Sequence, residues 1–505
     1  MGYHNLIIKT YGIIFLFLFM AGCKPQTEMN EKIVKYTEKH RPQYHFTPDS
    51  MWMNDPNGMV FFDGEYHLFY QYFPDSTVWG PMHWGHAVSK DLVHWEHLPI
   101  ALYPDSLGYI FSGSAVIDHE NTAGFGKDAM VAIYTYHDIQ GEKSGRIDFQ
   151  TQGIAYSLDK GRTFKKYDAN PVIKNPGIKD FRDPKVIWHA DTKSWVMVFA
   201  AYDKVLFYTS PDLKTWMPTG EFGIKGDDRL WECPDLFPIN VEGTGEQKWI
   251  LITSIQKKGP NGGTATSYFV GAFDGKKFIP DNDEQYWLDY GKDNYAFVTW
   301  SNTAEILGIG WMSNWQYAQV VPTQRWRSAM TLPRSLKLIQ NEKKYLLTSH
   351  PIKSLNTIHA KSTAIGNIKD TIIQTSIPEL CKIDLEFNKS AQGDKSIVRL
   401  SNSKNEYLDL GFDQKTNKYF IDRTNAGETD FNIDFPGLHF GDISYKSNKI
   451  QMSVYIDHAS VELFADEGKC VMTDIFFPSE PFTKLTIYHS GNLLSGSFTE
   501  LKRIW

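Results

Sequence analysis

Three acidic residues lie in similar local settings and are the residues of this chain best suited to chemistry. Asp55 lies in the motif WMNDPNG (52–58), Asp183 in FRDP (181–184) and Glu232 in WECPD (231–235). Because proline fixes φ and Asn-Gly favours a tight turn, these motifs should hold the carboxylates rigidly. One such motif alone would be read as a surface turn. Since glycosidic cleavage needs a pair of carboxyl groups beside the bond, the three together predict a glycan-cleaving site.

The elements that must position these acids are short β-strands in a loose internal repeat. A strand, a Ser-x-Asp turn and an aromatic residue recur at 87–95, 155–164 and 208–216, with a fainter copy at 272–278. A unit returning every ~50–70 residues is typical of propeller blades, and about 290 residues at roughly 58 each give five blades. The acids are 128 and 49 positions apart, so they fall in different blades. Because inner strands start near one axis, the acids are predicted to meet in a central funnel.

The whole chain is therefore predicted to be all-β. A five-bladed β-propeller catalytic domain (44–345) is followed by a linker (346–360) and a C-terminal β-sandwich (361–505). In this last region alternating strands recur every roughly eight to twelve residues, as at 383–387 and 460–464. It offers no convergent set of chemical groups, so its expected role is support or glycan contact.

The N-terminus is expected to be a targeting segment. An apolar run at 11–22 is too short to span a bilayer but suits a signal peptide covering residues 1–22. It ends in FMAGC, which resembles a bacterial lipobox with Cys23 as the lipidated residue, and residues 23–43 would form a tether. The prediction is export with a lipid anchor in a bacterial membrane, at the cell surface or in the periplasm. Plain secretion with an incidental cysteine is the alternative.

Composition limits the partners of the protein. The net charge of −7 with no basic stripe argues against nucleic acid and is compatible with a neutral glycan. Cys233, Cys381 and Cys470 are far apart and lack metal-ligand spacing, so we interpret them as small buried apolar residues without disulfides. His83 and His86 lie three positions apart, but no cysteine or carboxylate cluster supports a metal site. No cofactor or metal is expected.

The motifs resemble those of glycoside hydrolase family 32, the β-fructosidases. Besides the three acidic motifs, the resemblance includes FSGS (111–114), WGPMHWGH (79–86) and WMSNW (311–315). It implies a five-bladed propeller with a β-sandwich, and the motif sequences most resemble those of bacterial levanase-type exo-fructosidases. It further implies Asp55 as nucleophile, Glu232 as general acid/base and Asp183 as transition-state stabiliser. The expected substrate contacts are Trp52, Asn54, Gln71, Trp79, Phe111, Ser112, Arg182 and Trp315.

Some of these assignments have alternatives. Arg182 could be an ion-pair partner of a neighbouring carboxylate, and Trp79 and Trp315 could belong to the propeller core. For a retaining enzyme, Asp55 and Glu232 should lie roughly 5–5.5 Å apart.

The expected activity is release of fructose from the ends of levan or inulin, with sucrose as a further candidate substrate. An invertase, an endo-acting levanase and a fructosyl transferase are alternatives within enzymes. A catalytically inactive fructan-binding lipoprotein is the non-enzyme alternative, although all three carboxylates are present.

Overall fold

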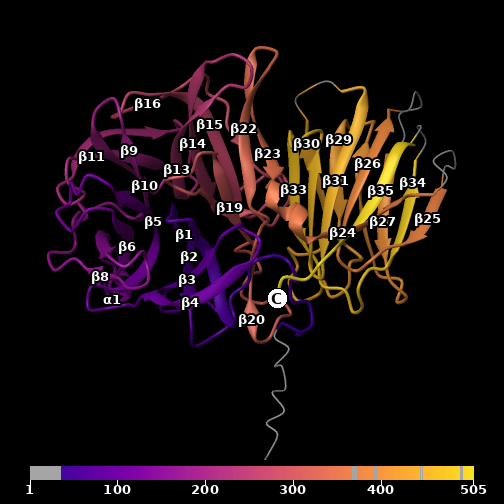
Figure 1. Ribbon diagram of the computed structural model, residues 1–505, viewed down its shortest axis with the longest axis horizontal. Coiled ribbons are helices and arrows are strands. Elements are labelled where there is room, and N and C mark those ends of the chain that lie inside the picture. Colours follow the sequence, from indigo (N-terminus) through magenta and orange to yellow (C-terminus); the bar gives the residue numbers. More distant parts are fainter. Residues whose placement is uncertain (1–35, 367–371, 390–394, 444, 446, 490–492) are drawn as a thin grey trace, which may run out of the picture. The chain divides into compact units, whose positions relative to one another are not determined.

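The computed structural model describes residues 36–505 except 367–371, 390–394, 444, 446 and 490–492 (Figure 1). The expected signal peptide, Cys23 and the tether up to residue 35 lie outside the described residues. Within the described ranges, no helix is long and apolar enough to cross a membrane. Residues 36–505 form one compact unit.

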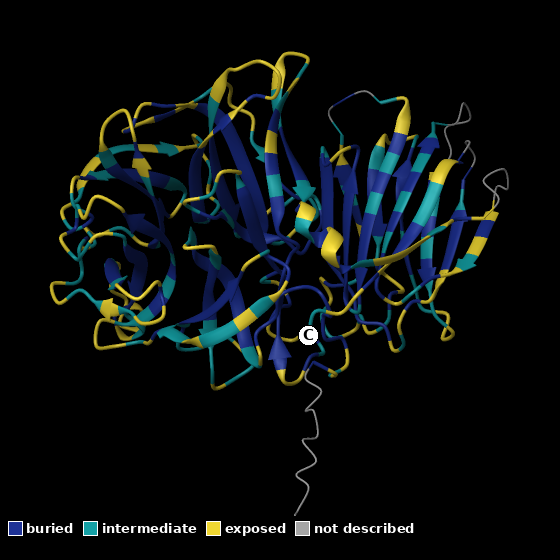
Figure 2. Ribbon diagram, viewed as in Figure 1, coloured by how far each residue is buried: buried dark blue, intermediate teal, exposed yellow. Residues whose placement is uncertain are grey.

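Nearly all regular structure in the described part of the chain is β-strand, as the turn-punctuated apolar runs predict. Its helices are α1 (Ile139–Lys143) and the 3-10 helix η1 (Lys353–Ile358). Figure 2 shows that the strands are largely buried and that many of the connecting loops are exposed. The all-β prediction is confirmed.

Residues 51–351 form five sheets, in which all pairs of strands but one are antiparallel. The first has β1 (Met51–Phe62), β2 (Glu65–Phe73), β3 (His83–Ser89) and β4 (Trp95–Leu102), and the second has β5 (Tyr109–Asp118), β6 (Ala129–His137), β7 (Gln150–Ser157) and β8 (Lys165–Lys166). The third has β9 (Phe181–His189), β10 (Ser194–Ala201), β11 (Lys204–Ser210) and β12 (Met217–Gly223). The fourth has β13 (Trp231–Asn240), β14 (Gln247–Ile255), β15 (Ala265–Phe273), β16 (Phe278–Pro280) and β17 (Tyr286–Trp287), and the fifth has β18 (Tyr295–Thr299), β19 (Leu307–Met312), β21 (Ala329–Met330), β22 (Arg334–Asn341) and β23 (Lys344–Pro351).

The first strands of these sheets close a ring. β1 contacts β5, β5 contacts β9, β9 contacts β13, β13 contacts β18, and β18 returns to β1. A later strand, β20 (Trp326–Arg327), pairs in parallel with the start of β1 and so joins the end of this region to its beginning. This arrangement is that of a β-propeller, in which each first strand is an inner strand.

The C-terminal region contains two six-stranded sheets within the described residues. One has the order β24 (His359–Ala364), β35 (Leu493–Leu501), β26 (Cys381–Asn388), β31 (Lys449–Asp457), β32 (Ser460–Ala465) and β33 (Cys470–Ile475). The other has the order β25 (Ile372–Ser376), β34 (Lys484–Tyr488), β27 (Lys395–Ser401), β28 (Tyr407–Asp413), β29 (Lys418–Asp422) and β30 (Leu438–Asp442). Apolar side chains from both sheets form one shared core. In β26 and β27, one strand from each sheet, alternate residues are buried.

Two segments that the sequence predicts to be a tether and a linker are packed against the rest of the fold. Residues 36–43 include Arg41 and Gln43, each only 1% exposed, so the described end of the expected tether is packed. Within the expected linker 346–360, β23 continues to Pro351 and η1 buries Leu355 and Ile358. Composition alone could not reveal this, because both segments are polar on their exposed sides.

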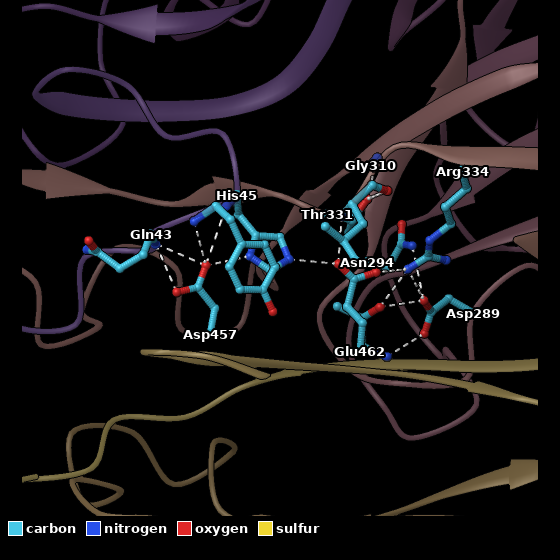
Figure 3. A network of polar contacts seen from close by, with 12 residues as sticks. Gln43, His45, Asp289, Asn294, Gly310, Thr331, Arg334, Asp457 and Glu462 are labelled. Atoms are coloured by element: carbon cyan, nitrogen blue, oxygen red, sulfur yellow. Dashed lines mark hydrogen bonds and ion pairs between the residues drawn. The ribbon is translucent and has the colours of Figure 1, made fainter. Parts of the chain in front are cut away.

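A buried polar network joins the start of the described chain to the C-terminal region (Figure 3). The carboxylate of Asp457 accepts hydrogen bonds from the backbone N–H of Gln43 and from Nδ1 of His45, both at 2.8 Å. Nε2 of His45 lies 3.0 Å from Glu462. Burial opposes the charged form of His45, but hydrogen bonds to the two acids raise its pKa to about 9. His45 is therefore a buried imidazolium at neutral pH.

Candidate active site

The site is built at the start of the five inner strands, where each strand breaks register with its neighbour. These irregularities lie next to Met53 in β1, Ile110 in β5, Arg182 in β9, Glu232 in β13 and Tyr295 in β18. A β-bulge bends its strand and redirects side chains, and bulges are over-represented next to active sites. The five strands thereby turn polar side chains toward their common axis.

The proline in two of the motifs explains part of this geometry. Pro184 and Pro234 lie inside irregular stretches, where no ladder hydrogen bond requires the N–H that proline lacks. The residue before each proline has a positive φ, 64° at Asp183 and 44° at Cys233. A non-glycine residue there costs about 1–3 kcal/mol, so the surrounding structure holds both residues in a strained conformation.

Asp55 is 8% exposed and its carboxylate is fixed from three sides. Oδ2 accepts a 2.6 Å hydrogen bond from Ser112 and a weaker one, at 3.4 Å, from the thiol of Cys233. Oδ1 accepts from the amide of Asn54 at 3.1 Å. The indole N–H of Trp52 donates to Asn54 Oδ1 at 2.7 Å, which sets the orientation of that amide. With 0% of its surface exposed, Trp52 reaches the site through this hydrogen bond.

Asp183 lies beside Asp55 across the thiol of Cys233. Its Oδ2 accepts from the backbone N–H of Cys233 at 3.1 Å, and the Cys233 sulfur lies 3.7 Å away. Nε of Arg182 is 3.7 Å from the same oxygen. The Asp183 N–H donates to the hydroxyl of Thr135 at 3.0 Å, which anchors the strained backbone.

Both carboxylate oxygens of Glu232 accept hydrogen bonds. Nη2 of Arg182 donates to Oε1 at 2.9 Å, and the hydroxyl of Tyr295 donates to Oε2. Nη1 of Arg182 is held in turn by Asp180 at 2.6 Å. The planar guanidinium therefore spans two blades, which a point charge on lysine cannot do. Arg182 thus forms the ion pairs that its alternative assignment expected.

The electrostatics of the cluster follow from burying three acids around one cation. Burial raises the pKa of Asp183 to about 7, and Glu232 and Asp55 add to this while Arg182 opposes it. Burial also raises the pKa of Asp55, against the hydrogen bond from Ser112. Although burial opposes the charge, Glu232, Asp183 and Asp180 raise the pKa of Arg182. Asp183 therefore binds its proton up to a much higher pH than an exposed aspartate does.

An aromatic cluster packs with Cys233 and Tyr295, two residues that contact the acids. Trp79, Phe111 and Trp315 are half-buried and pack in one cluster with Trp52. The rings of Trp79 and Phe111 lie 6.1 Å apart, edge to face, and those of Trp52 and Trp315 lie 5.8 Å apart. Half-buried indole and phenyl faces of this kind suit stacking against sugar rings.

Gln71 has a mainly supporting position. It is 2% exposed and its amide donates to the carbonyl of Ile110 at 3.0 Å. This bond fixes β5 next to Phe111 and Ser112. Of the eight residues expected to contact substrate, Asn54, Ser112 and Arg182 hydrogen-bond directly to the acids.

A cavity lies within the ring of inner strands, beside Asp183. All five inner strands line it, and its lining includes Ser112, Asp183, Lys185 and Cys233. Nζ of Lys185 lies 3.0 Å from Asp235, an acid that is fully buried in β13. The pair places a further cation within the ring.

Several groups of the site were missed by sequence reasoning. Cys233 was expected to be an inert apolar residue, yet its thiol contacts two of the acids. Tyr295 and Thr135 carry no motif signal, since an isolated tyrosine or threonine in a strand is ordinary. The nearest signal for Cys233 was its place between Glu232 and a proline.

The other cysteines and the histidine pair are explained by packing. Cys381 and Cys470 are buried free thiols. His86 lies 3.0 Å from His67, and His83 contacts the carbonyl of Pro81 at 2.9 Å. Across the ranges that the structure describes, no group of three or more His, Cys, Asp or Glu side chains could hold a metal ion.

Comparisons with known proteins agree with this geometry. Residues 45–351 match the glycosyl hydrolases family 32 N-terminal domain, and residues 346–504 match the family's C-terminal domain. The chain is 45% identical to a levanase of Bacillus subtilis (strain 168) over 492 residues, which cover 93% of this chain and 72% of the levanase. It is 38% identical to the extracellular exo-inulinase inuE of Aspergillus niger, over 90% of this chain and 93% of the inulinase.

A solved structure agrees at the level of the fold. The exo-inulinase from Aspergillus awamori superposes with a TM-score of 0.86 at 35% identity, covering 94% of this chain and 100% of the inulinase. The chain belongs to glycosyl hydrolase family 32, so the resemblance inferred from its motifs is confirmed. It is a glycosidase with a propeller and a C-terminal domain.

Proposed function

We propose that this protein is an exo-acting fructan β-fructosidase that releases fructose from the ends of levan or inulin. The observation that carries the proposal is the cluster in which Asp55, Asp183 and Glu232 are linked through Cys233 and Arg182. It supplies two carboxyl groups for a glycosidic bond and a third for sugar hydroxyls. The levanase and exo-inulinase relatives support the substrate class.

The proposed reaction is a double displacement. Asp55 attacks the anomeric carbon of a terminal fructose while Glu232 gives its proton to the departing glycosidic oxygen, which takes the electrons of the broken bond. Water then attacks the same carbon, Glu232 takes a proton from it, and Asp55 leaves as a carboxylate. Two inversions retain the configuration, which requires Asp55 and Glu232 to lie roughly 5–5.5 Å apart. Asp183 stabilises the oxocarbenium-like transition state.

We also propose the finer architecture. The five sheets of residues 51–351 are the blades of a five-bladed propeller, and the two six-stranded sheets are the layers of a β-sandwich. The closed ring of inner strands and the core shared by the two C-terminal sheets support this assignment. The domains would be 44–345 and 361–505, joined by residues 346–360.

Product analysis tests the function directly. Levan, inulin and sucrose are each incubated with the protein, and the products are separated by chromatography over time. Free fructose as the first product from either polymer supports exo action. Short oligosaccharides appearing before fructose would instead identify an endo-levanase, and turnover of sucrose alone would identify an invertase. Fructosylated products at high sugar concentration would identify transfer.

The non-enzyme alternative predicts binding without turnover. A fructan-binding lipoprotein would retain levan in a pull-down and release no sugar. Asp55→Asn distinguishes an enzyme from a binding protein. In an enzyme, the variant loses the release of sugar seen with the wild type while it keeps its affinity for the polymer.

The membrane anchor remains a proposal based on the FMAGC motif. Replacing Cys23 by Ala should release the protein from the membrane fraction, because one residue would carry the lipid. A Cys23→Ala protein that stays with the membranes would contradict the lipobox interpretation.

A further inference from the structure

The segment between β17 and β18 is hydrogen-bonded to the C-terminal domain. The N–H of Tyr290 donates to the carbonyl of Val471 at 2.7 Å, and the N–H of Asp293 donates to the carbonyl of Thr473 at 2.9 Å. Strand β33, which contains Val471 and Thr473, thus runs alongside residues 289–293 of the catalytic domain. These contacts fix the backbone immediately before β18.

Asp289 is the centre of this junction (Figure 3). Its carboxylate accepts from the N–H and the hydroxyl of Thr473 at 2.9 and 2.7 Å, and from the amide of Asn294 at 3.1 Å. Arg334 lies 2.9 Å from the same carboxylate and 2.7 Å from Glu462 of β32. Asp289, Arg334 and Glu462 are each at most 1% exposed, so solvent does not weaken these contacts.

The next residue after Asn294 reaches the active site. Tyr295 begins β18, is 1% exposed, and donates its hydroxyl to Glu232. Ala296 after it has a φ of 51°, so the backbone is strained where the tyrosine is aimed. A strained element of this kind keeps its direction only while its flanks are held.

We propose that the C-terminal domain acts on the acid/base residue Glu232 by holding Tyr295 in place, with Asp289 and Asn294 as the positioning residues. This inference rests on the proposed function, because it assumes that Glu232 donates and accepts the proton. It gives the C-terminal domain a part in the chemistry, in addition to support.

The chemistry of the contact explains why its geometry matters. A hydroxyl that donates to a carboxylate favours the ionised form, which is the form Glu232 takes after protonating the leaving oxygen. Burial and the charge of Glu232 raise the pKa of Tyr295 well above its usual value, so the phenol remains a donor. The other charged or titratable groups that face Glu232 are Arg182, Asp55, Asp183 and Cys233.

The primary test is the pH profile of kcat/KM with a fructan substrate. Tyr295→Phe removes the donor, so the limb where activity falls at high pH should move upward by about one pH unit, with about a tenfold loss of kcat. Thr473→Val removes the hydroxyl that donates to Asp289 and accepts from Arg334, and it should move the same limb in the same direction by a smaller amount. Thr473→Ser keeps the hydroxyl and should restore the wild-type profile.

Asp457→Asn is the matched control. Asp457 lies in the same interdomain network but bonds to Gln43 and His45 and makes no direct hydrogen bond to the 289–295 segment. It should lower the unfolding temperature and leave the pH profile unchanged. In the double variant Tyr295→Phe/Thr473→Val, the limb should lie where it does in Tyr295→Phe alone, because the positioning effect needs the hydroxyl.

The inference is wrong if Thr473→Val lowers stability while its pH profile and kcat match the wild type. It is also wrong if Asp457→Asn shifts the high-pH limb as far as Thr473→Val does. Any weakening of the interface would then be enough to shift the limb, and the 289–295 segment would have no special part. These outcomes can be measured only if the wild-type protein hydrolyses a fructan substrate. A wild type that releases no fructose from levan, inulin or sucrose would refute the proposed function instead.

Discussion

Replacing Asp183 by Asn should stabilise the folded protein while removing its activity. Asp183 is 6% exposed and burial raises its pKa to about 7, against an ordinary value of 3.8. Ionising it in the fold therefore costs about 4 kcal/mol, since one pKa unit corresponds to about 1.4 kcal/mol. Asparagine has nearly the same shape, carries no charge and can still accept the N–H of Cys233.

The sign of the effect depends on pH. Between pH 3.8 and about 7 the folded protein holds the Asp183 proton more tightly than the unfolded chain. The wild type therefore loses stability as pH rises through this window, whereas Asp183→Asn does not. At pH 4 the two proteins should be equally stable within ~1 kcal/mol, and at pH 8 the variant should be more stable by about 2–4 kcal/mol.

Urea unfolding at pH 4 and pH 8, followed by tryptophan fluorescence, measures this difference. Asp235→Asn is the matched control, because Asp235 is as deeply buried but is paired with Lys185 at 3.0 Å. Its loss leaves a buried cation without its partner, so this variant should be less stable than the wild type at both pH values. A gap between Asp183→Asn and the wild type that does not change with pH would refute the reasoning.

Three further predictions concern catalysis and the domain junction. Asp55→Ala should lower kcat/KM at least a thousandfold, about 4 kcal/mol of transition-state stabilisation, and near-normal fructan hydrolysis would contradict its role. Arg182→Lys should lower kcat at least about tenfold in steady-state assays, because one ammonium cannot hold both Asp180 and Glu232. An unchanged kcat would show that the two-sided contact of the guanidinium is dispensable. His45→Gln should be destabilising below pH 6.5, with the deficit shrinking by up to about 3 kcal/mol as pH rises to about 9, where His45 loses its proton. A deficit that is constant in urea titrations across this range would contradict the buried imidazolium.

Much of the fold could be predicted because its signals are local. Period-two apolar runs and turn residues are properties of neighbouring side chains, so the all-β character follows directly from them. The spacing of the repeat predicted the propeller, since each copy of the repeat corresponds to one supersecondary unit. The 346–360 segment was harder, because whether a polar stretch is packed depends on surfaces distant in the sequence.

The acids of the site were found for a related reason. Pro184, next to Asp183, and Pro234, two residues after Glu232, indicate a β-bulge, and a bulge is a local property of the backbone. Tyr295 and Cys233 were missed as contributors because their side chains are ordinary for a strand. Only the partners they meet across the ring make them functional.

The sequence alone therefore indicated which three acids lie in proline-containing, aromatic-flanked motifs and that these motifs belong to short β-strands. The tertiary structure alone decided that Arg182 and Tyr295 meet Glu232, from positions 50 and 63 residues away. It also decided that β33 fixes the segment before Tyr295. The physical reason is that backbone preferences act over a few residues, whereas these contacts exist only once the ring of inner strands has closed and the C-terminal domain has docked against it.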